Sequence, residues 1–421
     1  MLSLGIDIGT SGVRTAVLNG DTVVATARSN HPAQDPSNID AGKWWDAVAT
    51  CLDRQMVALR DAGHNTTDIS AVAVDGTSGS MVLTDAELRP VSPALMYNSK
   101  GFEAEAAQIA KHVSGDHITS GSNSALARAM RLVSVASDNP RHLLHQADFI
   151  AAKLLGHGGH SDFNNTLKTG FDPEVEAWPD WIGNVVDPGL LPKVHAPGER
   201  LGVVCADAVA RFGFSPDTRV HAGTTDSIAA FLAAAPLQED VAVTSIGSTL
   251  AIKLLSRTRI DDHAIGLYSH RLGDFWLVGG ASNTGGAVLA NFFTPEELAR
   301  LSAYMDPMQS TGLDYYPLVR PGERFPINDP DLQPRLDPRP DSDVLFLQGM
   351  FEGIARIETQ CYSEMKACGA EYPKKIYTAG GGAQNSVWTT IRASMLGLMP
   401  AAARYSEAAI GTAILAGSSE D

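Results

Sequence analysis

The stretch LGIDIGTSGVRTAVL, residues 4–18, decides the fold because it sets a carboxylate and a hydroxyl-rich turn between two apolar strands. The second strand continues into a hairpin whose Asn19-Gly20-Asp21 turn is a strong short-range signal, so the chain is expected to open with an antiparallel meander. Asp7 stands where the first strand ends at Gly9-Thr10-Ser11-Gly12. Its carboxylate either caps this turn locally or points at a ligand whose phosphates face the turn. The two interpretations stay open on this stretch alone.

Composition narrows the class of protein. The chain has 421 residues, of which 44% are apolar and 19% charged, and this suits a globular protein of two domains. A formal net charge of −16 argues against nucleic-acid and membrane partners and favours a small solute. The first strand begins near Leu2, which leaves no room for a secretory leader, so we expect a cytoplasmic protein.

The opening pattern of strand, carboxylate, glycine-flanked hydroxyls and strand recurs along the chain. It returns in VAVDGTSGSMVLTD and, about two hundred residues later, in AGTTDSIAAFLAA and VAVTSIGSTLAIKLLS. A long helix is expected over residues 343–369. The repetition predicts a duplicated α/β core with two domains, residues 1–225 and residues 226–421.

Two aspartates carry the predicted chemistry. Asp226 follows Gly223-Thr224-Thr225 and precedes an apolar helix, so by itself it reads as a helix cap. It nevertheless shares with Asp7 a setting of glycine and hydroxyl groups, and we expect one such aspartate in each domain, facing the other across a cleft. A Mg-nucleotide needs one carboxylate near its metal, and a reacting sugar hydroxyl needs another to accept its proton. No P-loop sequence competes with this hypothesis.

Seven stretches in order resemble the FGGY carbohydrate kinases, which are members of the actin-like ATPase superfold. They are GIDIGTSGVRTAVL, VAVDGTSGSMVLTD, AGTTDSIAAFLAA, TSIGSTLAI, GGASNTGGAVLANF, TAGGGAQNSVW and EAAIGTAILAG, and they span nearly the whole chain. The resemblance implies an α/β protein of two ribonuclease-H-like domains with mixed sheets, flanking helices and a central cleft. The first domain would hold the sugar and the first phosphate loop, and the second the nucleotide.

The resemblance also implies roles for individual residues. Asp226 would be the general base, and Asp7 would be catalytic by holding Mg²⁺ directly or through water. Asp75, Ser78 and Asp226 would contact the sugar. The ATP contacts would come from Thr10, Ser11, Gly247, Ser248, Asn283, Gly285, Gly381, Gly382 and Asn385. The implied cofactors are ATP and Mg²⁺, the partner is a small sugar, and a homodimer is left open.

The substrate prediction rests on departures from the family pattern. Several xylulose kinases carry Gln-Met-His-Gly in the sugar-contacting turn, where this chain has Gly76-Thr77-Ser78-Gly79, and their Trp-Asn-Asp is Tyr97-Asn98-Ser99 here. SDFNNTLKTGFDPEVEAWPDW instead resembles the short plant and cyanobacterial group labelled xylulose kinase-like and associated with D-ribulose phosphorylation. We therefore expect a D-ribulokinase. D-Xylulose, L-ribulose, a pentitol or glycerol, a non-catalytic sugar sensor and a nucleotide-dependent assembly protein remain alternatives.

Overall fold

The structure, a computed structural model, describes residues 1–137 and 139–418 and divides into two compact units. Unit 1 comprises Met1–Ala233 together with the end of the chain from Glu407, and unit 2 comprises Ala234–Ser406. This division departs from the predicted boundary at residue 225 in two places. The break falls later, within the helix that Asp226 begins, and the C-terminal helix belongs to unit 1 because it packs on the first strand.

Unit 1 is built on a mixed sheet of order β3-β2-β1-β4-β10-β9, with the short β11 also paired to β4. Its strands are β1 (Leu2–Ile8), β2 (Gly12–Asn19), β3 (Thr22–Asn30), β4 (Ile69–Gly76), β5 (Met81–Thr84), β6 (His142–His145), β7 (His160–Asp162), β8 (Lys193–His195), β9 (Arg200–Val203), β10 (Arg219–His221) and β11 (Thr224–Thr225). Its helices are α1 (Gly42–Asp61), α2 (Glu103–Ile109), α3 (Ala125–Val135), α4 (Gln146–Leu155), α5 (Phe163–Thr166), α6 (Ala206–Phe212), α7 (Asp226–Ala234) and α12 (Ala408–Gly417). The predicted meander is confirmed, since β1 pairs antiparallel with β2 and β2 with β3.

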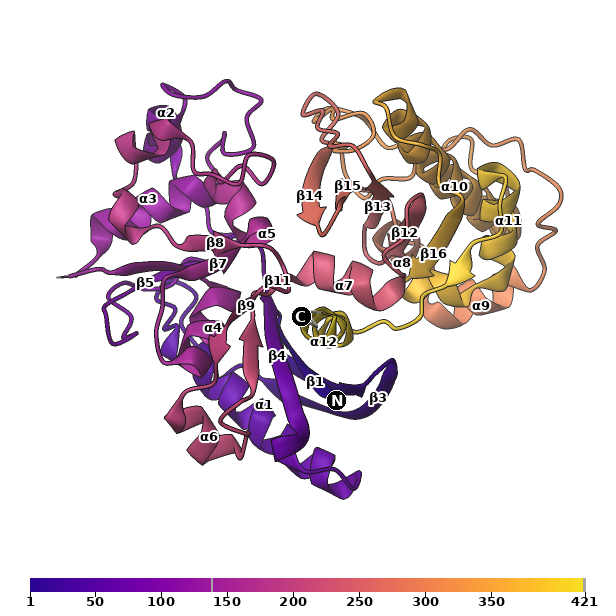
Figure 1. The fold of residues 1–421 in the computed structure, drawn as a ribbon. Helices are drawn as coiled ribbons and strands as arrows, with labels where there is room; N and C mark the ends of the chain where they lie inside the picture. The colour runs from indigo at the N-terminus through magenta and orange to yellow at the C-terminus, as the bar shows by residue number, and fades with distance from the viewer. Residues whose placement is uncertain (138, 419–421) are drawn as a thin grey trace. The chain divides into compact units, whose positions relative to one another are not determined.

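Strand β1 is buried along its whole length because both faces of the sheet are covered. Leu4 and Ile6 share a hydrophobic cluster with Trp44 of α1, whereas Gly5 points to the opposite face. A Cβ on Gly5 would collide with the backbone of α12 at Ala409. Glycine at this position therefore lets α12 lie directly on β1, as Figure 1 shows.

Unit 2 repeats the same plan with a sheet of order β14-β15-β13-β12-β16-β17. Its strands are β12 (Val241–Ile246), β13 (Leu250–Ser256), β14 (Tyr268–Leu272), β15 (Phe275–Ser282), β16 (Lys375–Ala379) and β17 (Ala401–Ala402). Its helices are α8 (Gly286–Ala290), α9 (Pro295–Ser302), α10 (Asp343–Ala367) and α11 (Ser386–Leu396). Antiparallel β12 and β13 with parallel β16 mirror β1, β2 and β4, which confirms the duplicated core.

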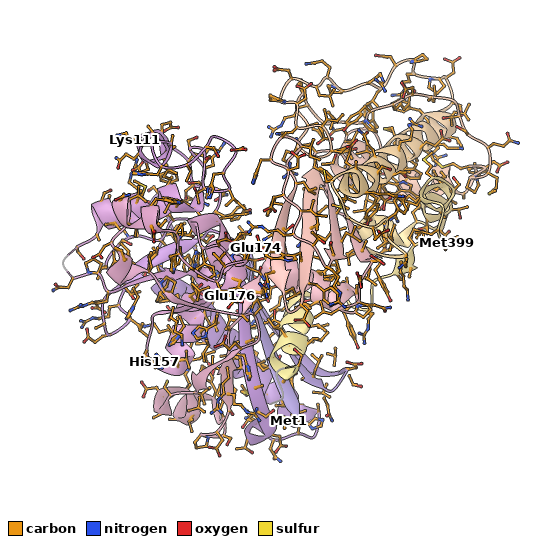
Figure 2. The ribbon with its side chains drawn as sticks, turned by 45° about the horizontal axis from the view of Figure 1, so that its top comes forward. Met1, Lys111, His157, Glu174, Glu176 and Met399 are labelled. Atoms are coloured by element: carbon orange, nitrogen blue, oxygen red, sulfur yellow. The ribbon has the colours of Figure 1, made fainter. Side chains whose placement is uncertain are left out.

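Side chains cover the surface of each unit, and Lys111 after α2 and Met399 after α11 are two exposed examples (Figure 2). Met399 is 65% exposed and is one of the scattered large apolar side chains at the surface. Within the described part of the chain, no helix combines the length and the apolar character that crossing a bilayer requires.

Candidate functional site

The first element of the site is the turn between β1 and β2. Asp7, 5% exposed, lies one residue before the end of β1, and the turn is closed by a bond from the N–H of Gly9 to the carbonyl of Gly12 (3.0 Å). Thr10 and Ser11 are exposed at its tip. The Arg14 guanidinium on β2 lies 3.4 Å from the Asp7 carboxylate. Burial raises the pKa of Asp7, and the positive charge of Arg14 opposes that rise.

Asp75 lies beside Asp7 because β1 and β4 are parallel and these two residues are in register. Asp75 is fully buried, and one of its oxygens, Oδ2, accepts a hydrogen bond from the Thr412 hydroxyl of α12. Its Oδ1 has no partner among the described residues. Burial, and then the negative charge of Asp7, raise the pKa of Asp75 well above its ordinary value.

Asp226 completes a group of three carboxyls in unit 1. The two-residue strand β11 pairs parallel with the end of β4, Thr224 opposite Asp75, and α7 begins directly after it with Asp226. The charge of Asp226 raises the pKa of both Asp7 and Asp75, which places it near them. The expectation of one aspartate per domain is therefore wrong: Asp7 and Asp226 both belong to unit 1, because β11 extends the sheet that holds β1.

A group of buried polar atoms surrounds the end of β4. In residues 1–137 and 139–418, no hydrogen-bond partner is found for Asp75 Oδ1, Ser78 Oγ, Gln146 Nε2, Asn164 Oδ1 and Thr225 Oγ1. Gln146 accepts from the N–H of Thr77, just after β4, and Asn164 donates to the Thr224 hydroxyl. Unpaired buried donors and acceptors are costly, so this group suits a ligand rich in hydroxyls.

Sequence reasoning identified Asp75 and Ser78 but missed Gln146, Asn164 and Thr225. Gln146 begins α4 and Asn164 lies in α5, far from β4 along the chain. The Asn-Asn-Thr run at residues 164–166 was a usable signal, because three polar residues after an apolar Phe163 are all buried in the structure. Nothing local marked Gln146.

Unit 2 contains a cavity of about 750 Å³, a volume in the range of nucleotide and other small-molecule sites. It is lined by the turn after β12, the start of α8, one face of α9 and the Gly-rich turn before α11. Five predicted nucleotide contacts lie on its wall: Gly247, Ser248, Gly381, Gly382 and Asn385. Two of these glycines face free space, since a Cβ on Gly381 would meet no atom within 4 Å and one on Gly247 none nearer than 3.9 Å.

Asn385 shapes this cavity through its own hydrogen bonds. Its Oδ1 accepts from the N–H of Trp388, which caps α11, and its Nδ2 donates to Ser302 of α9 (2.8 Å). Trp388 stacks on Phe351 with ring centroids 4.5 Å apart and an interplanar angle of 6°. The cavity thus has an aromatic wall beside a glycine turn, an arrangement that offers both a base-stacking surface and backbone N–H groups.

The structure does not bring Asn283 and Gly285, the other two nucleotide contacts predicted in unit 2, to the cavity wall. The Asn283 side chain donates to the carbonyl of Gly322 (2.9 Å) and accepts from Arg324 (2.8 Å), so it holds the loop that follows β15. Gly285 adopts a φ of +143°, and a Cβ there would lie 2.8 Å from the Ser248 carbonyl. Gly285 therefore lies against the turn at Ser248, which does line the cavity.

The residues fit Mg²⁺ only as part of a metal-nucleotide complex. Among the described residues no group of three or more His, Cys, Asp or Glu side chains is arranged to hold a metal ion. Mg²⁺ usually takes one or two carboxylates and completes its coordination with phosphate oxygens and water. The Asp7 carboxylate beside the exposed turn of Thr10 and Ser11 is compatible with such a complex.

The amino-acid sequence matches a known protein family over most of its length. Residues 2–136 match the N-terminal domain of the FGGY family of carbohydrate kinases, and residues 242–420 match its C-terminal domain. A xylulose kinase of Staphylococcus xylosus is 24% identical over 423 residues, covering 93% of this chain and 85% of the relative.

Two solved structures share the fold. A protein named "xyloylose kinase" from Brucella ovis superposes with a TM-score of 0.88 at 20% identity, covering 100% of this chain and 91% of that one. A gluconate kinase from Lactobacillus acidophilus gives a TM-score of 0.84 at 15% identity, covering 100% and 90%. The predicted α/β class with two ribonuclease-H-like domains is confirmed. Because the two names differ in substrate, this fold alone does not define the sugar.

Proposed function

The chain belongs to the FGGY family of carbohydrate kinases and is an ATP-dependent sugar kinase, and we propose that it phosphorylates D-ribulose at the C5 hydroxyl. The observation that carries the proposal is the group of three carboxyls, Asp7, Asp75 and Asp226, at one end of the unit 1 sheet beside unpaired buried polar atoms. Carboxylates accept hydroxyl protons, and hydroxyl-rich sugars supply them.

We assign the proton transfer to Asp226. In this step its carboxylate removes the proton from the C5 hydroxyl, the sugar oxygen forms a bond to the γ-phosphorus, and the bond to the bridging oxygen of ATP breaks to release ADP. Asp226 is half-buried at the start of α7. Asp75 is fully buried, and this burial raises its pKa well above the ordinary value, which favours the protonated form. Asp226 is therefore the better base of the two, and Asp75 is assigned to a hydroxyl of the sugar.

We assign Asp7 to Mg²⁺ and the hydroxyls of Thr10 and Ser11 to the γ-phosphate. Bound Mg²⁺ would neutralise charge on the transferring phosphate. The exposed position of Thr10 and Ser11 supports their role, because both hydroxyls are accessible to a ligand. The adenosine is assigned to the unit 2 cavity, with Gly247, Ser248, Gly381 and Gly382 toward the phosphates or ribose and Asn385 shaping the wall.

Asp7→Asn should raise the Mg²⁺ concentration that half-saturates turnover by about 10- to 100-fold, because a neutral amide oxygen is a weaker ligand than a carboxylate. The measurement is ADP release at fixed ATP and sugar across a Mg²⁺ titration. The matched control is Arg14→Gln, which removes the 3.4 Å ion pair and keeps the carboxylate. An unchanged Mg²⁺ midpoint in Asp7→Asn, or an equal shift in Arg14→Gln, contradicts the assignment.

D-Xylulose is the second candidate substrate, because the Staphylococcus xylosus relative is named a xylulose kinase. D-Ribulose is preferred here for two reasons. The turn after β4 reads Gly76-Thr77-Ser78-Gly79 in place of the Gln-Met-His-Gly of several xylulose kinases, and the stretch 161–181 resembles the short group associated with D-ribulose. The two sugars differ only in the configuration at C3, which hydrogen-bond geometry must distinguish.

The test is Mg-ATP-dependent ADP release with D-ribulose, D-xylulose, L-ribulose, ribitol, L-arabinitol and glycerol, compared as kcat/KM. We expect D-ribulose to exceed every other sugar by at least about tenfold, the discrimination given by one well-placed hydrogen bond. A higher value for D-xylulose would overturn the substrate while keeping the kinase mechanism. Absence of sugar-dependent ADP release would instead favour the non-catalytic sensor.

A further inference from the structure

A buried arginine lies against the turn that follows β4. Arg128 occupies the first turn of α3, and α3 packs against β5, the strand that leaves this turn (Figure 1). The side chain is 3% exposed, although arginine is rarely buried without a partner. Its Nε donates to the Gly79 carbonyl (2.9 Å) and its Nη1 to the Asn123 carbonyl (2.9 Å).

One nitrogen of the guanidinium has no hydrogen-bond partner among the described residues. Its Nη2 donates to no group in the part of the chain that the structure describes, and no described carboxylate pairs with it. Burial without a countercharge lowers the pKa of Arg128 to about 10. Nη2 also lies 2.7 Å from the point where a Cβ on Gly79 would stand. The glycine therefore keeps open the space in which this donor sits.

The turn that Arg128 contacts carries or adjoins some of the unpaired buried polar atoms at the end of β4. Gly79 follows Ser78, whose buried hydroxyl has no partner among the described residues, and the same turn is tied to Gln146 through Thr77. The unpaired atoms in this region include acceptors from carboxyl and amide groups, which suit hydroxyl donors of a sugar. Gln146 Nε2 and Arg128 Nη2 differ from these acceptors because each can only donate, and of the two only Arg128 carries a positive charge.

The reacting form of the sugar contains an oxygen that can accept hydrogen bonds but cannot donate one. In the ring form of a ketopentose, O5 is bonded to C2, so O5 is free to attack only in the open chain. The open chain carries a C2 ketone whose oxygen has lone pairs and no proton. A donor without a protein partner matches that oxygen. An alditol presents a hydroxyl in its place, which can also accept but carries a proton that needs an acceptor of its own, and a guanidinium is not an acceptor.

We propose that Arg128 Nη2 donates a hydrogen bond to the C2 carbonyl oxygen of an open-chain ketose and thereby selects ketoses over the corresponding alditols. This inference rests on the proposed function. It identifies the C2 carbonyl as the part of the sugar by which the site distinguishes a ketose from an alditol. Arg128 contacts substrate but takes no part in proton transfer, so its loss should change sugar discrimination and leave the KM for ATP unaltered.

The experiment compares the wild-type protein with Arg128→Met and Arg128→Lys. For Arg128→Met, kcat/KM for D-ribulose should fall about 10- to 100-fold, the loss expected for a hydrogen bond from a charged donor, and kcat/KM for ribitol should change less than about threefold. Arg128→Lys keeps a charged donor and should recover part of the ketose preference. Arg131→Met is the matched control, since Arg131 lies on the same helix but pairs with Glu105 (2.5 Å).

Calorimetric binding of D-ribulose and ribitol gives a second readout that does not need turnover. An equal loss for both sugars in Arg128→Met and in Arg128→Lys would overturn the inference, because an arginine that only holds the turn affects every substrate alike. A wild-type preference for D-ribonate that Arg128→Met abolishes would also overturn it in favour of a carboxylate. Failure of every ketose to be phosphorylated counts against the proposed function, whereas an unchanged binding ratio counts against Arg128 alone.

Discussion

Replacing Asp226 by asparagine should lower kcat for the preferred sugar by roughly 10²- to 10⁴-fold, the range that a general base contributes. The amide cannot accept the hydroxyl proton, so the step in which the sugar oxygen attacks phosphorus loses its base. The residue begins α7, and asparagine caps helices about as well as aspartate does. The folded structure should therefore survive the change.

This substitution separates the two interpretations of Asp226. If the residue only capped α7, Asp226→Asn would keep near-normal turnover and Asp226→Ala would lose stability and activity together. If it is the base, both variants should lose turnover while binding of ADP to the unit 2 cavity, measured by calorimetry, stays within about threefold of the wild type. A kcat for Asp226→Asn close to that of the wild type contradicts the assignment.

The second large effect is expected on stability, at the ion pair between α10 and α11 in unit 2. Arg392 donates through Nε and Nη2 to both oxygens of Glu358, each at 2.7 Å, and the two side chains are 1% exposed. Thr244 of β12 donates to the same carboxylate. Arg392→Met leaves that carboxylate buried and unpaired, so unit 2 should lose about 3–5 kcal/mol.

The measurement is urea unfolding of the variant, followed on the transition that ADP shifts to higher denaturant, since a ligand stabilises the part that binds it. The matched control is Arg339→Met, which breaks an exposed ion pair to Asp343, the first residue of α10, and should cost no more than about 1 kcal/mol. Adding Glu358→Leu to Arg392→Met should restore most of the lost stability. Equal losses for the two single variants would contradict the expectation.

Much of the fold could be predicted because its signals are local. The hairpin turn at Asn19-Gly20 predicted the meander. The 3.6-residue periodicity of residues 343–369 predicted a long helix, which is observed as α10, Asp343–Ala367. The recurrence of one strand-turn-strand pattern gave the duplicated core. The position of α12 could not be obtained this way. It lies on β1 because Gly5 leaves room for its backbone, and no periodicity within either segment records that contact.

In the candidate site, too, the residues with a local sequence signal could be predicted and the contacts between distant segments could not. Asp7 was identified because it stands where a strand ends at a glycine turn, whereas Asp75 and Ser78 were identified through the family resemblance of VAVDGTSGSMVLTD. The placement of Asp226 was wrong, because the domain boundary was drawn from pattern recurrence and the pairing of β11 with β4 carries no sequence signal. Arg128 and Gln146 were missed for a related reason. Each reaches the turn after β4 from a helix remote in sequence.

The sequence by itself determined where strands end in glycine and hydroxyl turns, which aspartates stand there, and the family to which these motifs belong. The tertiary structure decided which of those groups meet and which partners they have. The bond from Thr412 to Asp75 joins residues 337 positions apart, and it exists only because α12 returns to the first sheet. Turn chemistry and periodicity act over a few neighbouring residues, whereas the pKa of a buried carboxyl and the unused donor of a buried arginine depend on which distant segments pack around them.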